Sequence, residues 1–521
     1  MRNKFFKTLA VVSVAALTGI AACGDDDEDN GGDNGNGGDN GGGADTPSLQ
    51  QDAVDAGQIG TADGSGLMID ANTLAITGIA PEAPATALPA GFDTADYYGA
   101  VDPASADGDA WWQEWTAIDA RFDGNLPGAD FHPLQAEIEG GTIVPASENG
   151  CTDVNPDFSA GGTVDVFGET FPVCIIDTNI TADTSLPNNH VFVLNGTVNV
   201  GEGDEQGEAD RSMGATLTIA AGTQIYANSE GQGGTSLAIT RGSQINANGT
   251  RTQPIIFAAV ALNTAQTEIT GDVTDLTATG EWGGVILSGN GLVNNGNQDG
   301  ELASEASPEL SARWFGGSDN ADSSGSLEYV IIAETGFAFQ PDAEVQGLTV
   351  EAAGSGTVID FVQIIGSADD CVEWFGGAAS ASHLICVGVD DDGLDIDSGY
   401  VGNIQFAIVR IGESNGERGI ESDSNGSNFD ATPVTDPNIA NLLVLGNAGN
   451  DDDDSQGALH REGFAGRVYR SVYTDDTLAG GAFDDGCLDV DDVIPGTLGY
   501  FDVVFNCSGG AGGGLATADD D

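Results

Sequence analysis

Lysine is almost absent from this sequence, and positive charge of any kind is scarce. The chain holds 13 Lys and Arg against 83 Asp and Glu, which gives a formal net charge of −70. Both lysines, Lys4 and Lys7, lie in the first 22 residues; without that segment, which has three basic residues and no acidic one, the charge is −73. So acidic a surface repels nucleic acid and anionic lipid, which excludes nucleic acid as a partner. It suits divalent cations, basic partners or a salty habitat that screens self-repulsion.

Several catalytic signatures are also missing. The chain has four His and no G-x-S-x-G motif, so it shows neither a metalloenzyme constellation nor a serine nucleophile elbow. No cysteine lies in a CxxC motif or beside a matched His, which argues against zinc binding and thiol catalysis. Long amphipathic helical patterns are nearly absent as well. Short β-branched runs broken by Gly, Asn and Asp predict an all-β fold instead.

The seven cysteines divide into one near the start of the chain and six that form three sequence-local pairs. An even set outside the cytoplasm indicates disulfides, and many connectivities are formally open. The clustering favours pairing between sequence neighbours, which are 23, 15 and 20 residues apart. The six cysteines are Cys151, Cys174, Cys371, Cys386, Cys487 and Cys507.

The first 22 residues have the features of a secretion signal. A basic start precedes an apolar run, residues 9–22, that is too short to span a bilayer and ends in small residues. The sequence Ile20-Ala21-Ala22-Cys23 resembles the lipobox of bacterial lipoproteins, so Cys23 is expected to carry lipid and to anchor the mature protein. Ordinary cleavage beside an incidental cysteine is the alternative. Gly24 and the acidic residues after it resemble lipoproteins of the outer membrane or the cell surface.

Composition divides the chain into five parts. Residues 1–22 are the signal peptide, and residues 23–45 are the lipidated cysteine and a disordered Gly/Asp/Asn tether that has almost no apolar residue to bury. Residues 46–187 show no clear repeat and are interpreted as an N-terminal cap or small module. Residues 188–507 show repeats, and residues 508–521 are expected to be a flexible tail.

The repeat predicts the architecture of the long C-terminal part. LTIAAGTQIYAN (217–228) recurs as LAITRGSQINAN (237–248), with Leu, Ile and Gly matched at a spacing of 20 residues. Trp-Phe-Gly-Gly at 314–317 recurs at 374–377, three such periods later. Inward Leu and Ile with a Gly at each corner are typical of coils of about three short strands, which bury their apolar face by stacking. We therefore predict a right-handed parallel β-helix; the motif of a leucine-rich repeat is missing.

The part before the repeats carries clustered aromatic residues. WWQEWT (111–116) places Trp111, Trp112 and Trp115 where they could stack on sugar rings or pack inside the cap. The spacing favours packing. We expect this module to cover the open end of the solenoid, whose strand edges would otherwise pair with other chains.

Several segments, taken in order, resemble a largely uncharacterised family of secreted or lipid-anchored bacterial surface proteins. The resemblance covers roughly residues 92–410. It implies a β-helix at the cell surface and brings no established reaction or catalytic residues. The matching segments are YYGAVDP (97–103) with WWQEWT (111–116), LTIAAGTQI (217–225) with PIIFAA (254–259), GEWGGVILSGNG (280–291), SGSLEYVII (324–332), SADDCVEWFGG (367–377) and DDDGLDID (390–397).

The most informative polar motifs are acidic. DDDGLDID (390–397) and FDDGCLDVDD (483–492) share one layout, and SADDCVEWFGG (367–377) adds another acidic pair. Equivalent residues of stacked coils lie about 4.8 Å apart, so carboxylates there need a cation or a raised pKa. Ca²⁺ accepts about 6–8 oxygen ligands, and we predict that it binds at least one cluster; solvated loop tips of a salt-adapted surface are the alternative. The candidate ligands are Asp369, Asp370, Asp390, Asp391, Asp392, Asp395, Asp397, Asp484, Asp485, Asp489 and Asp491.

Many β-helices cleave polysaccharides, so catalysis is an alternative function for this chain. Acidic pairs at 369–370 and 390–391 could supply the two carboxylates that glycoside hydrolysis requires. Beyond residue 22, the Gly-His-Gly and Arg-x-Lys motifs of polygalacturonase-type β-helices do not occur, and no lysine is left to act as a lyase base. Arg410 and Arg418 keep an arginine base formally open.

The favoured function is therefore non-catalytic. We expect a lipid-anchored protein of the outer membrane or cell surface, whose calcium-stabilised β-helix displays a binding face for adhesion or glycan binding. Its partners would be the membrane, through the anchor, and an extracellular glycan or surface protein. The alternatives are a polysaccharide-degrading lyase or glycoside hydrolase and a purely structural envelope protein.

Overall fold

The structure is a computed structural model that describes most of the chain between residues 59 and 508. No described helix is long and apolar enough to cross a bilayer, and α3 (Cys151–Val154) is a single turn. The signal segment, Cys23, the tether and residues 509–521 lie outside the described residues. The described residues are 59–61, 67–79, 84–116, 138, 140–147, 150–166, 168–202, 205–207, 214–229, 234–260, 278–306, 313–339, 344–412, 416–446, 455–476, 478, 481–493 and 497–508.

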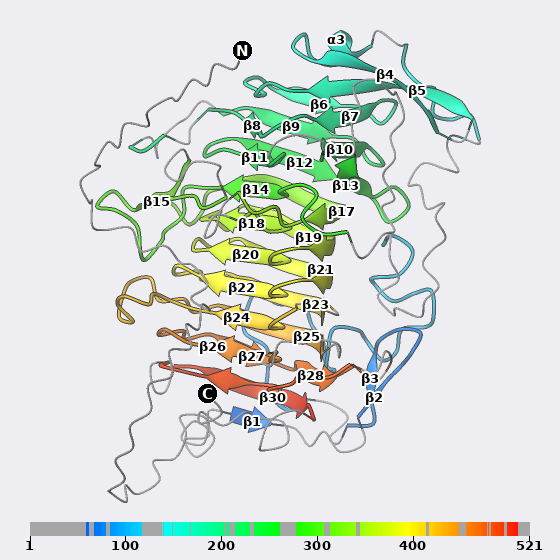
Figure 1. The fold of residues 1–521 in the computed structure, drawn as a ribbon. Helices are drawn as coiled ribbons and strands as arrows, with labels where there is room; N and C mark the ends of the chain where they lie inside the picture. Colours follow the sequence, from blue (N-terminus) through cyan, green and yellow to red (C-terminus); the bar gives the residue numbers. More distant parts are fainter. Residues whose placement is uncertain are drawn as a thin grey trace, which may run out of the picture.

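Two large sheets run the length of the molecule, and their strands, apart from β1, follow one another down the stack in chain order (Figure 1). All neighbours in the nine-stranded sheet pair in parallel, as do those in the larger sheet except β4 and β5. The nine-stranded sheet contains β8 (Val198–Val200), β11 (Leu237–Ile239), β14 (Val285–Ser288), β18 (Leu348–Glu351), β20 (Val372–Phe375), β22 (Leu394–Asp397), β24 (Ile420–Ser422), β26 (Leu459–His460) and β29 (Asp489–Val490).

The larger sheet has 17 strands, and two short hairpins accompany the stack. Its strands are β1 (Ile59–Thr61), β4 (Ser159–Val166), β5 (Glu169–Ile176), β6 (Thr184–Leu186), β7 (Val191–Leu194), β9 (Thr216–Ile219), β10 (Gln224–Asn228), β12 (Gln244–Asn248), β13 (Ile255–Val260), β17 (Gly325–Thr335), β19 (Val358–Ser367), β21 (Ser380–Val389), β23 (Asn403–Ile411), β25 (Asn438–Gly446), β27 (Arg467–Tyr469), β28 (Val472–Asp475) and β30 (Gly499–Asn506). The hairpins are β2 (Met68–Ile69) with β3 (Ile76–Thr77) and β15 (Glu301–Ala303) with β16 (Trp314–Gly316).

Each coil in the middle of the stack consists of one short strand of the nine-stranded sheet and one long strand of the larger sheet. β20, for example, is followed by β21, which bends at His383, where φ is 53°. Tyr329, Phe361, Phe406 and Asn441 have φ between 51° and 59° and bend β17, β19, β23 and β25 at the same register position. The bend divides each long strand between two faces, so a coil has three faces. The prediction of a parallel β-helix is confirmed.

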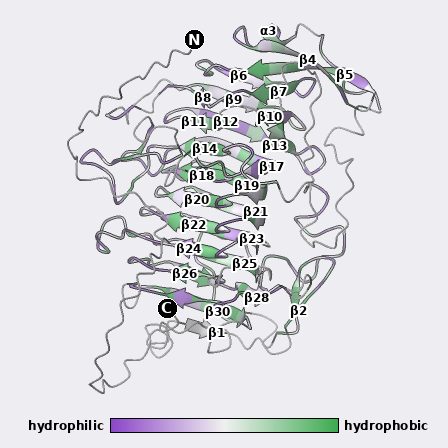
Figure 2. Ribbon diagram, in the orientation of Figure 1, coloured by the Kyte–Doolittle hydropathy of each residue, from purple (hydrophilic) through white to green (hydrophobic). Residues whose placement is uncertain are grey.

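Alternation along the short strands explains why this sequence stacks. Leu348, Val372, Leu394 and Ile420 pair in register on four successive coils, and none of their side chains is exposed. Successive residues of a strand point to opposite faces, so these side chains fill the interior while their neighbours point outward. Figure 2 shows hydrophobic colour on strands such as β14, β18 and β22 and hydrophilic colour on many of the loops that leave the stack.

The 20-residue spacing of the sequence repeat is not the length of one coil. Leu217 lies in the larger sheet and pairs with Ile245, 28 residues later, whereas Leu237 lies in the nine-stranded sheet and pairs with Val285. The two copies are therefore one strand–corner–strand motif placed on different faces. They match because each contains a Gly with φ of 77° at its corner. The Trp-Phe-Gly-Gly copies likewise lie in different settings, the hairpin strand β16 and the coil strand β20.

The segments before the solenoid are distributed over three places. β1 pairs in parallel with β30, at the last coil, while β5 pairs with β7 at the first coil (Figure 1). Between them, residues 84–116 form a segment, hereafter the strap, that lies along the bent long strands. Trp112 and Trp115 are buried in the strap, and the edge of the Trp115 ring faces Tyr329. The tryptophans therefore pack against the solenoid.

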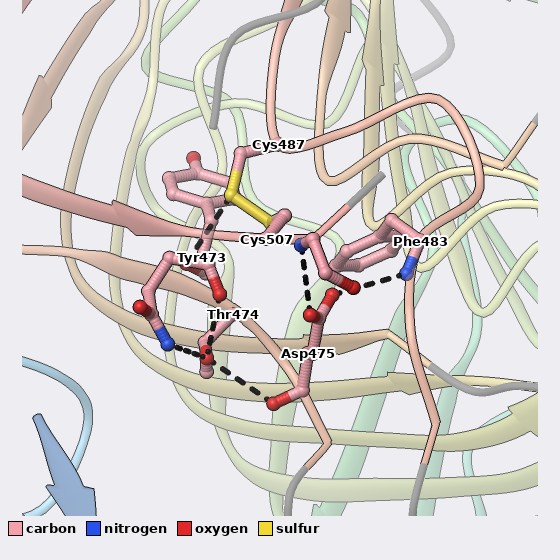
Figure 3. The surroundings of a disulfide bond; sticks show 8 residues. Tyr473, Thr474, Asp475, Phe483, Cys487 and Cys507 are labelled. Carbon is pink, nitrogen blue, oxygen red and sulfur yellow. Dashed lines mark hydrogen bonds between the residues drawn. A yellow bond between two sulfur atoms is a disulfide. The ribbon is translucent and has the colours of Figure 1, made fainter. Parts of the chain in front are cut away.

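Three disulfides join the cysteines that are neighbours in sequence, as the clustering predicted. They link Cys151 to Cys174, Cys371 to Cys386 and Cys487 to Cys507. Figure 3 shows the last of these beside Tyr473, whose carbonyl oxygen lies 3.4 Å from the sulfur of Cys487. Such disulfides persist in oxidising compartments, so they indicate a protein that folds outside the cytoplasm.

Candidate metal centre

A group of carboxylates lies where two successive coils enter the nine-stranded sheet. Asp369 and Asp370 occupy the corner before β20, and Asp391 occupies the equivalent corner before β22. Within the strands, Glu373 of β20 pairs in register with Asp395 of β22. Parallel strands are about 4.8 Å apart, so the stacking of two coils places these acids side by side.

The carboxylates form two overlapping groups of three. Asp369, Asp370 and Asp391 make up the corner group, and Asp370, Glu373 and Asp395 make up the sheet group. Within each group, one oxygen from every residue lies within 4.8 Å of the others. Asp370 belongs to both groups. Carboxylate oxygens at such separations are the ligands that hard cations such as Ca²⁺ and Mg²⁺ prefer.

The centre is buried although it lies on the outer side of the sheet. Asp369, Asp370 and Glu373 are 7%, 6% and 5% exposed. A covering segment, residues 301–306, reaches the centre through Gln346, whose side-chain amide donates to Glu305 at 3.1 Å and to Asp369 at 3.2 Å. Asp391 and Asp395 are half-buried, so the centre keeps a side toward solvent.

Burial and like charge both act on the titration of these acids. The pKa of Asp370 is raised well above its usual value, first by burial and then by the charges of Asp369 and Asp391. The pKa of Glu373 is raised by burial and then by the charges of Glu305 and Asp395. A carboxylate held in this way binds either a proton or a cation, since isolated buried negative charge is costly.

The other predicted ligands near these coils have different surroundings. Asp390 accepts a hydrogen bond from the hydroxyl of Thr279 at 3.0 Å. Asp392 accepts one from the backbone N–H of Arg418 at 2.7 Å, and burial raises its pKa. Asp397 accepts one from the hydroxyl of Ser398 at 3.0 Å. Among the described residues, neither carboxylate group includes these three side chains.

The second acidic motif lies on a later coil. Asp484, Asp485, Asp489 and Asp491 belong to the segment that contains β29. Asp395 and Asp489 share a register column but are three strands apart, which corresponds to roughly 14 Å. In the described part of the chain, these four acids form no group of the kind found at 369–395. The shared sequence layout therefore does not place the two motifs in one site.

Sequence reasoning missed Glu373 and Glu305. Glu373 lies between Val372 and Trp374, which fill the interior, so alternation in SADDCVEWFGG was a usable signal for its outward position. Glu305 approaches from a covering segment 64 residues away from Asp369, and no local pattern indicates that contact.

The two arginines considered as bases are engaged in ion pairs. Arg410 binds Asp476 at 2.7 Å, with both side chains buried. Arg418 contacts Glu417 at 2.5 Å and Glu421 at 3.5 Å. Ion pairing stabilises the charged guanidinium, so neither residue is prepared to accept a proton.

Known proteins resemble this chain to different degrees. The crystal structure of full-length tailspike protein 2 from the Escherichia coli O157:H7 bacteriophage CAB120 matches at 10% identity and a TM-score of 0.27. The match covers 85% of this chain and 62% of the tailspike chain, so this chain spans less than two thirds of the tailspike's length. No curated protein matches the sequence. A family model described as a pectate-lyase-like beta helix domain matches residues 178–506, and the chain therefore belongs to that family.

Proposed function

We propose that this protein is a non-catalytic cell-surface lipoprotein whose β-helix is stabilised by Ca²⁺ and displays a binding face for adhesion or glycan binding. The observation that carries the proposal is the buried group of carboxylates shared by two coils, Asp369, Asp370 and Glu373 with Asp391 and Asp395. A cation there would join the coil that begins with β20 to the coil that begins with β22.

Calcium suits this centre better than magnesium. Ca²⁺ takes about 6–8 oxygens in flexible geometry, whereas Mg²⁺ requires near-octahedral coordination and usually keeps several waters. A set of carboxylates on two successive coils supplies many oxygens. The arginines Arg410 and Arg418 are ion-paired, which supports a structural role for the cation over a lyase mechanism.

The anchor is the second element of the proposal. The sequence Ile20-Ala21-Ala22-Cys23 supports lipidation, and the three disulfides support export. Metabolic labelling with palmitate should mark the wild type and fail to mark Cys23→Ser, and protease added to intact cells should degrade the wild type. Unlabelled wild-type protein would contradict the anchor without affecting the metal.

Removal of Ca²⁺ tests the stabilising role directly. For the full mature lipoprotein in detergent, chelation at fixed ionic strength should lower the Tm by several degrees, because a ligand that binds only the folded state stabilises it. Asp370→Asn should abolish that Tm difference, and the matched control Asp484→Asn should keep it. An unchanged Tm in the wild type after chelation would contradict the calcium proposal.

Glycan binding is tested separately from the metal. The calcium-loaded protein should retain a class of extracellular glycans on an array, and chelation should reduce that binding only as far as it unfolds the coils. Failure to bind any glycan or surface protein, with the fold intact, would favour a purely structural envelope component.

Polysaccharide degradation is the second candidate because the family model is pectate-lyase-like. Under this alternative, incubation with polyuronates would generate unsaturated or reducing ends, and Asp370→Asn would abolish them. We expect no such products from the wild type.

A further inference from the structure

The geometry points to a centre that holds two divalent cations bridged by Asp370. The inference rests on the proposed calcium-binding function and specifies how many ions the centre takes and which residues hold each. One ion would lie in the corner group, Asp369, Asp370 and Asp391, and the other in the sheet group, Asp370, Glu373 and Asp395.

A single ion does not account for the carboxylates present. Ca²⁺ accepts about 6–8 oxygens, whereas five carboxylates offer more than one such ion can bind. The charges lead to the same result. With all five carboxylates ionised, one divalent cation leaves three negative charges unbalanced, and two leave one. Burial makes each uncompensated charge costly, so the second ion stabilises the folded protein.

Glu373 provides evidence for the second ion that is independent of the number of acids. Its side chain is 5% exposed, and it has no hydrogen-bond donor among the described residues. One of its carboxylate oxygens nevertheless lies within 4.8 Å of oxygens from Asp370 and Asp395. Buried polar groups are almost always hydrogen-bonded or bound to a ligand. A cation in the sheet group supplies the missing partner.

The two ions would stabilise different contacts between the same coils. The corner ion joins the turn that carries Asp369 and Asp370 to the next turn at Asp391. The sheet ion joins the strands β20 and β22 through Glu373 and Asp395, which are paired in register. Asp370 bridges both ions because its two oxygens can bind one ion each.

Calcium titration of the full mature lipoprotein by calorimetry tests the inference. Titration in roughly 1 M monovalent salt, where the Debye length is about 3 Å, suppresses weak binding by the acidic surface. The wild type should bind two Ca²⁺ per chain. Glu373→Gln and Asp391→Asn should each bind one, because each variant removes a ligand from one group only. Asp370→Asn should weaken both ions at least tenfold, and Asp484→Asn should still bind two.

Each result has a separate meaning. One ion in the wild type, unaffected by Glu373→Gln, would overturn the two-ion inference and leave calcium stabilisation intact. No binding in the wild type would overturn both. These variants remove charge from a crowded carboxylate group without changing side-chain size, so the metal-free proteins should fold. Circular dichroism and the metal-free Tm verify folding before titration.

Discussion

The imidazole of His383 lies flat against the ring of Phe361, with ring centroids 4.2 Å apart and planes 4° apart. Both residues have left-handed backbone conformation, with φ of 53° and 54°. This conformation costs roughly 1–2 kcal/mol for a residue with a side chain. Tyr329 and Phe406 continue the same stack on the coils before and after. Aromatic stacking contributes about 0.5–1.5 kcal/mol per pair, so it offsets the strain of bending the long strands.

The strap covers this aromatic stack, and Trp115 is the residue that best tests the contact. The side chain of Trp115 is fully buried, and its ring edge faces Tyr329 and Phe361 at 5.7 and 6.1 Å between centroids. Trp115→Ala should cost about 3–5 kcal/mol, measured by chemical denaturation, and should expose the strap to limited proteolysis. Trp115→Phe, the matched control, should lose less stability than Trp115→Ala. Unchanged proteolysis of the alanine variant would contradict this role of the strap.

The fold was predictable from sequence because its signals are local. Alternating apolar residues such as Leu394 and Ile396, followed by a turn, identify a half-buried strand without knowledge of its partner. Register was not predictable, because coils differ in length: 28 residues separate the paired Leu217 and Ile245, whereas 22 separate Val358 and Ser380. A short sequence match therefore identifies a corner and does not show which face follows it.

The same distinction applies to the metal centre. Acidic corners at 369–370 and 390–391 were recognisable because both immediately precede a strand. Glu305 was not recognisable, because it reaches the centre from a covering segment whose position depends on tertiary packing. The motif at 483–492 has the same layout as the motif at 390–397 and yet lies on a later coil, where its acids form no group of this kind among the described residues.

The disulfide between Cys371 and Cys386 should support both stability and calcium binding. It closes a loop of 15 residues across one coil, and Cys371 directly follows Asp370. Replacing both cysteines with Ala should cost about 3 kcal/mol, the loop-closure value for that length, and should weaken calcium binding. Removing the bond between Cys487 and Cys507, whose separation is 20, should cost a similar amount and leave calcium affinity unchanged. Equal effects on affinity would show that the response is global.

A buried ion pair attaches the β15–β16 hairpin to the coils. Nη1 of Arg241 lies 2.8 Å from Oε1 of Glu301, and neither side chain is exposed. Glu301→Gln should cost about 3–5 kcal/mol, because it leaves a buried guanidinium without its charge partner. The double variant Arg241→Met with Glu301→Gln should be more stable than the single variant. Strictly additive losses in a double-mutant cycle, measured by urea denaturation, would mean that the two charges do not interact.

His460 makes a pH-dependent contribution to the free energy of unfolding, and this contribution is separate from that of the carboxylates. Burial lowers its pKa from 6.5 to about 3, and its ring stacks on Phe464 and contacts the hydroxyl of Tyr500. Between those two pH values the unfolded chain binds more protons at this residue than the folded chain does. Stability therefore rises with pH in this window, and the contribution of His460 is lost as the pH falls.

Replacing His460 with a neutral residue isolates its contribution to the free energy of unfolding, because the wild type and the variant have the same titrating acids. His460→Gln should be less stable than the wild type at about pH 7, where the buried imidazole is neutral and packed. The difference should shrink on acidification toward about pH 4, by at most about 1.4 kcal/mol for each pH unit. Urea denaturation of both proteins across this range measures the difference in unfolding free energy. A difference that stays constant with pH would show that His460 has the same pKa in the folded and unfolded chains.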